Sequence, residues 1–248
     1  MGKQLGPPQR RTLAPRRPAD EPPPEKPAIL PLPLRVFSIV ETTRLQTILS
    51  GYYDIPDLEF AVPPHVLDIG AHVGASTLWL SKRWPGATIN AYEPHPASAE
   101  ALRTNVDGIP NVHVHALAVV GSKWPVDVPL TLYDGRAVAR TRSLYQLGEQ
   151  RMTGVVVDTI QVSTLPPATI LRVDTEGCEV EILEEYPHIQ QIDAIMVEWK
   201  RPDDRKRILQ QMPGKGFKLV KDAALRNGRD HLIIYARSPR ITAPPKTP

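Results

Sequence analysis

An acidic residue, a glycine-rich turn and the start of a helix follow one another in the segment VLDIGAHVGASTLWL, which begins at residue 66. Asp68 closes an apolar run, and Gly70, Ala71 and Gly74 follow it. Glycine lets a chain turn tightly and lets its backbone approach a ligand closely. The helix expected next points unpaired N–H groups toward the same space. These residues therefore predict a turn that binds a nucleotide-containing cofactor.

The spacing of the glycines separates two kinds of cofactor. A dinucleotide-binding turn has the pattern G-x-G-x-x-G, but His72 and Ala75 occupy its second and third glycine positions counted from Gly70. S-adenosylmethionine (SAM) has no pyrophosphate for such glycines to hold, so the turn fits SAM better. Asp68 would then lie near the cationic methionine end of SAM, directly or through water.

A second acid, Glu93, ends the next predicted strand about 20 residues further on, where a carboxylate can accept hydrogen bonds from both hydroxyls of a ribose. His115 and Ala116 follow the third predicted strand and are candidates for the adenine side of the site, with a plain packing role as the alternative. Asp68 and Glu93 have an alternative too, as ordinary caps at strand ends. The turn and its two spaced acids together favour the cofactor site.

Three further acids are predicted to surround a methyl acceptor. The segment ILRVDTEGCEVEIL places Asp174 and Glu176 after a strand, and DAIMVEWK places Glu198 at the end of the next strand. A hydroxyl acceptor loses a proton during methyl transfer, so a nearby base helps. We predict that Asp174 or Glu176 is this base or orients the acceptor, with Glu176 favoured and Glu198 a weaker candidate. The alternative is that Asp174 and Glu176 cap the helix that begins near Cys178.

Strand and helix patterns alternate along the middle of the chain. Alternation of this kind predicts an α/β fold, in which helices cover both faces of a parallel sheet and ligands bind beyond the carboxyl ends of the strands. The last two strand patterns predict a closing antiparallel hairpin, and the stretch 121–160 is ambiguous. The predicted strands are 65–70, 87–93, 111–120, 128–133, 155–160, 168–174, 192–199, 217–221 and 231–237, and the predicted helices are 34–50, 75–84, 96–106, 178–186 and 203–212.

Length and composition fit one domain between two tails. Of the 248 residues, 41% are apolar, which is enough for a buried core, and no apolar run is long enough to cross a membrane. Residues 1–33 and 238–248 are rich in proline and carry the basic excess, so we predict disordered tails around a domain at 34–237. The single cysteine, Cys178, and the lack of an apolar signal segment favour a cytoplasmic location.

These segments resemble those of the FkbM family of methyltransferases. The matching stretches are VLDIGAHVGAST, AYEPHP, ILRVDTEGCEVEIL and IMVEWK, in this order within residues 62–200. The resemblance implies a Rossmann-like class I SAM-dependent methyltransferase fold with a mostly parallel seven-stranded sheet. It also implies O-methylation of a hydroxyl on a small molecule, sugar or glycan. One departure is Arg172, where the family commonly has lysine, and it bears on acceptor choice if that position touches the acceptor.

Two other functions stay open at this stage. Arg136, Arg140, Arg142 and Arg151 could track phosphates, which keeps a nucleic-acid methyltransferase in view. The N-P-P-Y motif for exocyclic amino groups is absent, and so is a Pro-Cys nucleophile. The second alternative is a SAM-binding regulator without turnover, against which the three acids argue. Histidine and acid spacings predict no bound metal, with magnesium held by the acid cluster as the alternative. The sequence leaves the acceptor and the oligomeric state open.

Overall fold

The computed structural model describes residues 45–55, 58–124, 130–133, 154–175, 177–199, 201–224 and 231–237. The predicted tails at 1–33 and 238–248 lie outside the described residues. So do Glu176 and the arginines between 136 and 151. No helix in the described part of the chain is long and apolar enough to cross a membrane.

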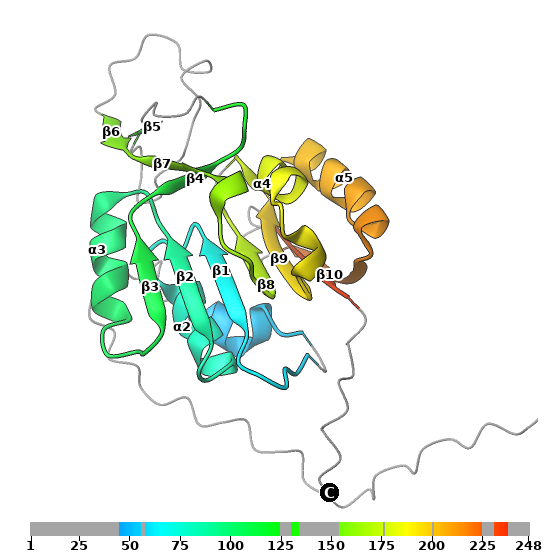
Figure 1. Cartoon of the computed structure of the whole chain (residues 1–248), viewed down its shortest axis with the longest axis horizontal. Helices are drawn as coiled ribbons and strands as arrows, with labels where there is room; N and C mark the ends of the chain where they lie inside the picture. Colours follow the sequence, from blue (N-terminus) through cyan, green and yellow to red (C-terminus); the bar gives the residue numbers. More distant parts are fainter. Residues whose placement is uncertain are drawn as a thin grey trace, which may run out of the picture. The chain divides into compact units, whose positions relative to one another are not determined.

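Seven strands form a mostly parallel sheet (Figure 1). In their order across the sheet, the strands are β10 (Lys218–Ala224), β11 (His231–Ala236), β9 (Ala194–Trp199), β8 (Ile170–Val173), β1 (His65–Ile69), β2 (Thr88–Tyr92) and β3 (Val112–His115). The five strands from β9 to β3 run parallel, and β11 pairs antiparallel with both β9 and β10. The predicted seven-stranded sheet with a C-terminal antiparallel hairpin is confirmed.

Helices and apolar side chains cover both faces of this sheet, as predicted. The helices of five or more residues are η1 (Ile48–Tyr52), α2 (Ala75–Arg83), α3 (Pro96–Asn105), α4 (Glu179–Glu185) and α5 (Pro202–Gln211). The short 3-10 helices are η3 (Val162–Thr164), η4 (Ile189–Gln191) and η5 (Pro213–Lys215). On one face, Leu67 and Ile195 belong to a buried layer that includes side chains of α4 and α5. On the other face, Val66 and Met196 belong to a layer that includes side chains of α2 and η1. Helix α3 contacts the edge strand β3.

The alternation of side chains along the strands turns three charged residues to one face. Asp68, Arg172 and Glu198 each lie two positions after an apolar residue of the layer under α2 and η1. Side chains two residues apart on a strand share a face. All three charged side chains therefore point toward α2 and η1, near the carboxyl ends of β1, β8 and β9. Asp68 and Arg172 are also direct partners in the register of β1 and β8.

Two small sheets follow β3, and all of their strands except β4 lie mainly in the stretch 121–160 that the sequence left ambiguous. Their strands are β4 (Ala118–Val120) parallel to β7 (Thr159–Gln161), and β5 (Leu130–Tyr133) antiparallel to β6 (Gly154–Val157). The predicted strand 111–120 is therefore two strands, and so is the predicted strand 155–160. The run 111–120 alternates without a break, and the run 155–160 is broken only by Asp158. In each run the two halves pair with different neighbours, which a local pattern cannot reveal.

The segment before β1 is fastened to the far edge of the sheet. The ammonium group of Lys221, on β10, donates hydrogen bonds to the carbonyl oxygens of Tyr52 (2.7 Å) and Gly51 (3.4 Å). Gly51 has φ of +101°, a non-helical conformation inside η1. The predicted helix 34–50 agrees with the structure over residues 45–50, the part of it that is described.

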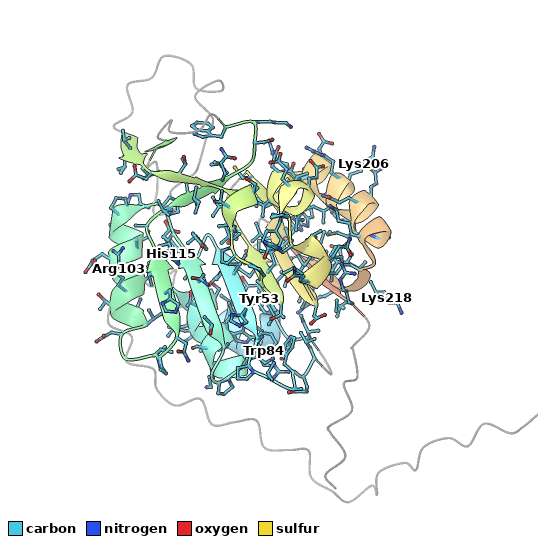
Figure 2. The ribbon with its side chains drawn as sticks, in the orientation of Figure 1. Tyr53, Trp84, Arg103, His115, Lys206 and Lys218 are labelled. Atoms are coloured by element: carbon cyan, nitrogen blue, oxygen red, sulfur yellow. The ribbon has the colours of Figure 1, made fainter. Side chains whose placement is uncertain are left out.

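Aromatic side chains join this segment to α2, the helix that follows β1. Tyr53 is fully buried, and its ring centroid lies 5.5 Å from that of Trp79 on α2. The Trp79 ring lies in turn 5.7 Å from that of Trp84, which follows α2 (Figure 2). This packing holds the Tyr53 side chain beneath the sheet, on the face that carries Arg172.

Replacing Lys221 with methionine should lower the free energy of unfolding by about 1–2 kcal/mol, since the two carbonyls lose a charged donor while the apolar stem of the side chain is kept. Urea unfolding measures the change. Lys218→Met is the matched control, because Lys218 is an exposed residue of the same strand. Equal stability of the two variants would show that Lys221 does not hold the segment.

Candidate active site

The glycine turn lies where β1, β2 and β8 end. The backbone N–H groups of Gly70 and Ala71 donate to the carbonyl of Tyr92, at 2.8 and 3.0 Å. Gly70 has φ of +83°, and a Cβ there would lie 1.9 Å from the carbonyl oxygen of Asp174. Gly74 has φ of +96°, and a Cβ there would lie 2.7 Å from a leucine of α3. At Gly70 the turn therefore packs backbone to backbone against the residue that follows β8.

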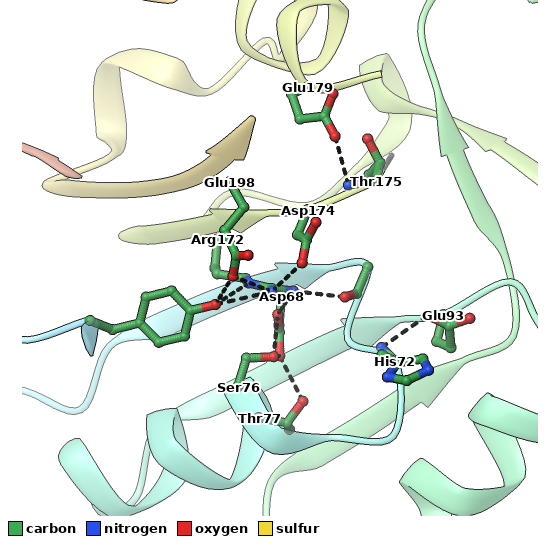
Figure 3. Close-up of polar contacts among 12 residues, drawn as sticks. Asp68, His72, Ser76, Thr77, Glu93, Arg172, Asp174, Thr175, Glu179 and Glu198 are labelled. Atoms are coloured by element: carbon green, nitrogen blue, oxygen red, sulfur yellow. Dashed lines mark hydrogen bonds and ion pairs between the residues drawn. The ribbon is translucent and has the colours of Figure 1, made fainter. Parts of the chain in front are cut away.

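Glu93, which follows β2, fastens the turn from its other side (Figure 3). Its two carboxylate oxygens accept hydrogen bonds from the backbone N–H groups of His72 and His95, both at 2.9 Å. Burial raises the pKa of Glu93 to about 7, against the lowering effect of these two hydrogen bonds. A carboxylate oxygen has two lone pairs. Glu93 can therefore accept further hydrogen bonds from a ligand while it holds the turn.

Asp68 ties β1 to the first turn of α2. Its carboxylate is completely buried and accepts hydrogen bonds from the hydroxyls of Ser76 (2.8 Å) and Thr77 (2.6 Å). It also forms an ion pair with Arg172 at 3.3 Å. Asp68 is enclosed by protein, and the low dielectric constant of the interior strengthens the interaction of its charge with nearby charges.

Arg172 lies at the centre of the site and is 2% exposed. Its guanidinium donates to five acceptors (Figure 3). They are the phenol oxygen of Tyr53 (3.1 and 3.3 Å), Asp68 Oδ1 (3.3 Å), the carbonyl oxygen of Gly70 (2.7 Å), Asp174 Oδ2 (2.9 Å) and Glu198 Oε1 (3.1 Å). Burial alone would lower the pKa of Arg172, but the phenol and the three carboxylates raise it well above its ordinary value.

The structure brings two of the three predicted acceptor-side acids together around this guanidinium. Asp174 and Glu198 both form ion pairs with Arg172. Glu198 is 1% exposed and also accepts a hydrogen bond from the hydroxyl of Tyr53. Glu176, the favoured candidate, lies outside the described residues. The roles of all three acids in proton transfer stay predictions.

Glu179, the first residue of α4, holds the backbone of Thr175 and Gly177. One of its oxygens, Oε1, accepts hydrogen bonds from the backbone N–H groups of Thr175 (3.0 Å) and Gly177 (3.1 Å). Burial raises the pKa of Glu179 to about 7, and Asp174 contributes to the rise. The last acid of the DTEGCE block therefore faces the backbone of its own turn.

The two candidates for the adenine side lie at the end of β3. The Nε2 atom of His115 lies 2.9 Å from Oδ1 of Asn90, and its ring stacks on that of Tyr92 with centroids 4.6 Å apart. Burial and the neighbouring His113 lower the pKa of His115, which favours its neutral form. Ala116 is exposed. The adenine role of His115 and Ala116 stays a prediction.

Sequence reasoning missed four residues of this site: Tyr53, Ser76, Thr77 and Glu179. It assigned Arg172 only a possible effect on acceptor choice. The sequence does indicate that Arg172 has carboxylate partners, because an arginine inside the apolar run ILRV of a buried strand needs its charge to be paired. Within the described residues, no three His, Cys, Asp or Glu side chains are grouped so that they could hold a metal ion.

Known methyltransferases are similar to this chain over most of its described part. The model of the methyltransferase FkbM domain matches residues 68–219. Methyltransferase sdnD of Sordaria araneosa is 25% identical over 210 residues, which cover 69% of this chain and 80% of that protein. Methyltransferase 1 of Beauveria bassiana is 24% identical over 188 residues, which cover 64% of this chain and 73% of that protein.

A solved structure shows the same fold. The crystal structure of an FkbM methyltransferase from Methylobacillus flagellatus superposes with a TM-score of 0.54 at 14% sequence identity. The superposition covers 77% of this chain and 47% of that one. At this identity the likeness bears on the arrangement of helices and strands alone.

Replacing Gly70 with alanine should destabilise the protein more than Gly108→Ala does. Both glycines have a left-handed conformation, so both variants incur a backbone strain of about 1–2 kcal/mol. Only the Cβ at position 70 meets backbone atoms, whereas a Cβ at position 108 meets nothing within 4 Å. Urea unfolding of both variants compares them, and equal losses would contradict the close backbone contact with Asp174.

Proposed function

The chain belongs to the FkbM family of methyltransferases, and from that premise we propose that it moves the methyl group of SAM to a hydroxyl on a small molecule, sugar or glycan. The observation that carries the proposal is the contact between the Gly70 turn and Asp174. It brings the predicted cofactor turn and the predicted acceptor-side acid to one place at the carboxyl ends of the strands, where α/β folds bind ligands.

The charges at this place favour a cationic cofactor. Three carboxylates, those of Asp68, Asp174 and Glu198, surround the single guanidinium of Arg172, and the buried Glu93 lies on the other side of the turn. A positive ligand nearby would reduce the repulsion among these carboxylates. When bound, SAM supplies a methyl group that is already activated by its positively charged sulfur.

The residues of the turn would hold this cofactor. Gly70 and Gly74 let the turn pack closely against Asp174 and α3, and this packing would fix the backbone that faces the cofactor. Glu93 would accept the ribose hydroxyls with the lone pairs that His72 and His95 leave available. Asp68 would favour the cationic methionine end through its charge.

The acceptor-side acids would orient the hydroxyl and take its proton. A base placed within hydrogen-bond reach of the acceptor contributes a rate factor of about 10²–10⁴. A proton on Asp174 Oδ2 would weaken the ion pair of that atom with Arg172. Glu198 is likewise engaged by Arg172 and Tyr53. Both observations keep Glu176 the favoured base.

The affinity for SAM should rise between pH 6 and pH 8. Glu93 has a pKa of about 7 in the structure, so it is largely protonated at pH 6 and ionised at pH 8. A ribose needs the ionised carboxylate as acceptor, so the affinity should fall by about tenfold for each pH unit below the pKa. Isothermal titration calorimetry with SAM across this range measures the effect.

Glu93→Gln provides the control for this titration. The variant should bind SAM more weakly than the unchanged protein at pH 8, with little change between pH 6 and pH 8. A pH dependence that persists in the variant would assign it to another group, for which Glu179 has a suitable pKa of about 7. An affinity of the unchanged protein that is flat across the range would contradict the ribose role of Glu93.

The acceptor can be found by incubating the protein with methyl-labelled SAM and pooled hydroxylated small molecules, glycans or RNA. We expect mass spectrometry to find the label on oxygen in a small-molecule or glycan pool. Glu176→Gln should lower this transfer by about 10²–10⁴-fold and leave SAM affinity unchanged. Label in RNA alone would overturn the proposed acceptor class, and full activity of the variant would exclude Glu176 as the base.

A further inference from the structure

Arg172 joins the two halves of the proposed site. Its guanidinium donates at 2.7 Å to the carbonyl of Gly70, on the cofactor side, and at 2.9 Å to Oδ2 of Asp174, on the acceptor side. We propose that Arg172 is a positioning residue, which fixes the cofactor turn and the acceptor-side carboxylate in one geometry. This inference rests on the proposed function, and it assigns Arg172 no direct contact with either substrate.

The guanidinium bridges the place where the two backbones meet. Gly70 is so close to Asp174 that a Cβ on it would lie 1.9 Å from the carbonyl oxygen of Asp174. The same two residues are the ones that Arg172 bonds with two different nitrogens, Nη1 and Nη2. A planar guanidinium holds its donors at fixed separations. The distance between the Gly70 carbonyl and the Asp174 carboxylate is therefore set by the geometry of one rigid group.

Two further partners keep the guanidinium from turning. The hydroxyl of Tyr53 accepts from Nε and from Nη2 of Arg172, and it donates to Glu198. Glu198 itself accepts from Nη2 at 3.1 Å. Tyr53 comes from the segment before β1 and Glu198 from β9, so two further parts of the chain fix the plane of the guanidinium.

A purely stabilising role explains this arrangement poorly. A buried ion pair gains little net stability, because removing charges from water costs about as much as their attraction returns. Here three carboxylates share one guanidinium, which adds repulsion among Asp68, Asp174 and Glu198. In-line methyl transfer, in contrast, depends on alignment, and a displacement of about 1 Å can cost about 10²-fold in rate. The ion pairs of Arg172 with the three carboxylates would therefore serve to align the cofactor and the acceptor.

Arg172→Lys tests the inference, since it keeps the charge and removes the rigid fork. An ammonium group in place of the guanidinium can reach the Gly70 carbonyl or Asp174, but it cannot hold both at the same separation. We expect kcat for methyl transfer from labelled SAM to the acceptor pool to fall by about 10²-fold. The Kd for SAM should stay within about threefold of its original value. Rates are divided by the number of SAM-binding sites that calorimetry counts, which removes any loss of folded protein.

Arg237→Lys is the matched control. Arg237 follows β11 and bonds the carbonyl oxygens of Ile192 (2.8 Å) and Ile189 (3.2 Å), at the end of the sheet where β9 begins. It is thus another arginine that joins separate segments, away from the glycine turn. Its lysine variant should lose stability and keep its kcat per SAM-binding site. An equal loss of kcat in both variants, or an unchanged kcat in Arg172→Lys, would overturn the inference.

Tyr53→Phe keeps the test decisive if Arg172→Lys fails to fold. It leaves the guanidinium and its bonds to Gly70 and Asp174, but removes the hydroxyl that fixes its plane. We expect kcat per SAM-binding site to fall by about fivefold, the effect of one lost hydrogen bond, and no fall would overturn the inference. Absence of both SAM binding and methyl transfer in the unchanged protein would instead refute the proposed function, and the inference with it.

Discussion

A single buried guanidinium determines how the parts of this site fit together. Three carboxylates surround Arg172 at the carboxyl ends of adjacent strands, and without the guanidinium they would remain in the interior with no positive partner among these residues. This requirement fixes the register of β1 and β8, where Asp68 lies opposite Arg172. It also positions the segment before β1, because the hydroxyl of Tyr53 accepts a hydrogen bond from Arg172. The glycine turn rests on this arrangement through the carbonyl of Gly70.

Most of the fold could be predicted from local patterns. The apolar runs that end at Asp68 and Asp174 are buried parallel strands, and the two final strand patterns form the antiparallel pair β10 and β11. The patterns failed where pairing changes along one run. The predicted strand 111–120 leaves the main sheet after His115 and pairs elsewhere from Ala118 onward, and no local property of the sequence marks that change.

The site could be predicted only where its residues follow a strand end. Asp68, Glu93, Asp174 and Glu198 were predicted in this way, because the fold places the ends of parallel strands side by side, and their roles stay predictions. Tyr53 could not be found, since it reaches Arg172 and Glu198 across 119 and 145 residues of sequence. Glu179 was part of a recognised block, but only the structure shows that its carboxylate turns back to the amides of Thr175 and Gly177.

The edge position of β10 has a consequence for how copies of the protein meet. An edge strand offers unpaired backbone groups to which another chain could add a strand. On β10 the apolar residues Leu219 and Val220 are exposed, but Lys218 and Lys221 flank them. Two such strands brought together would place lysines of both copies close to one another, and their repulsion opposes growth of the sheet from one molecule into the next. The Lys221 ammonium already bonds the carbonyls of Gly51 and Tyr52, so the exposed Lys218 supplies most of this repulsion.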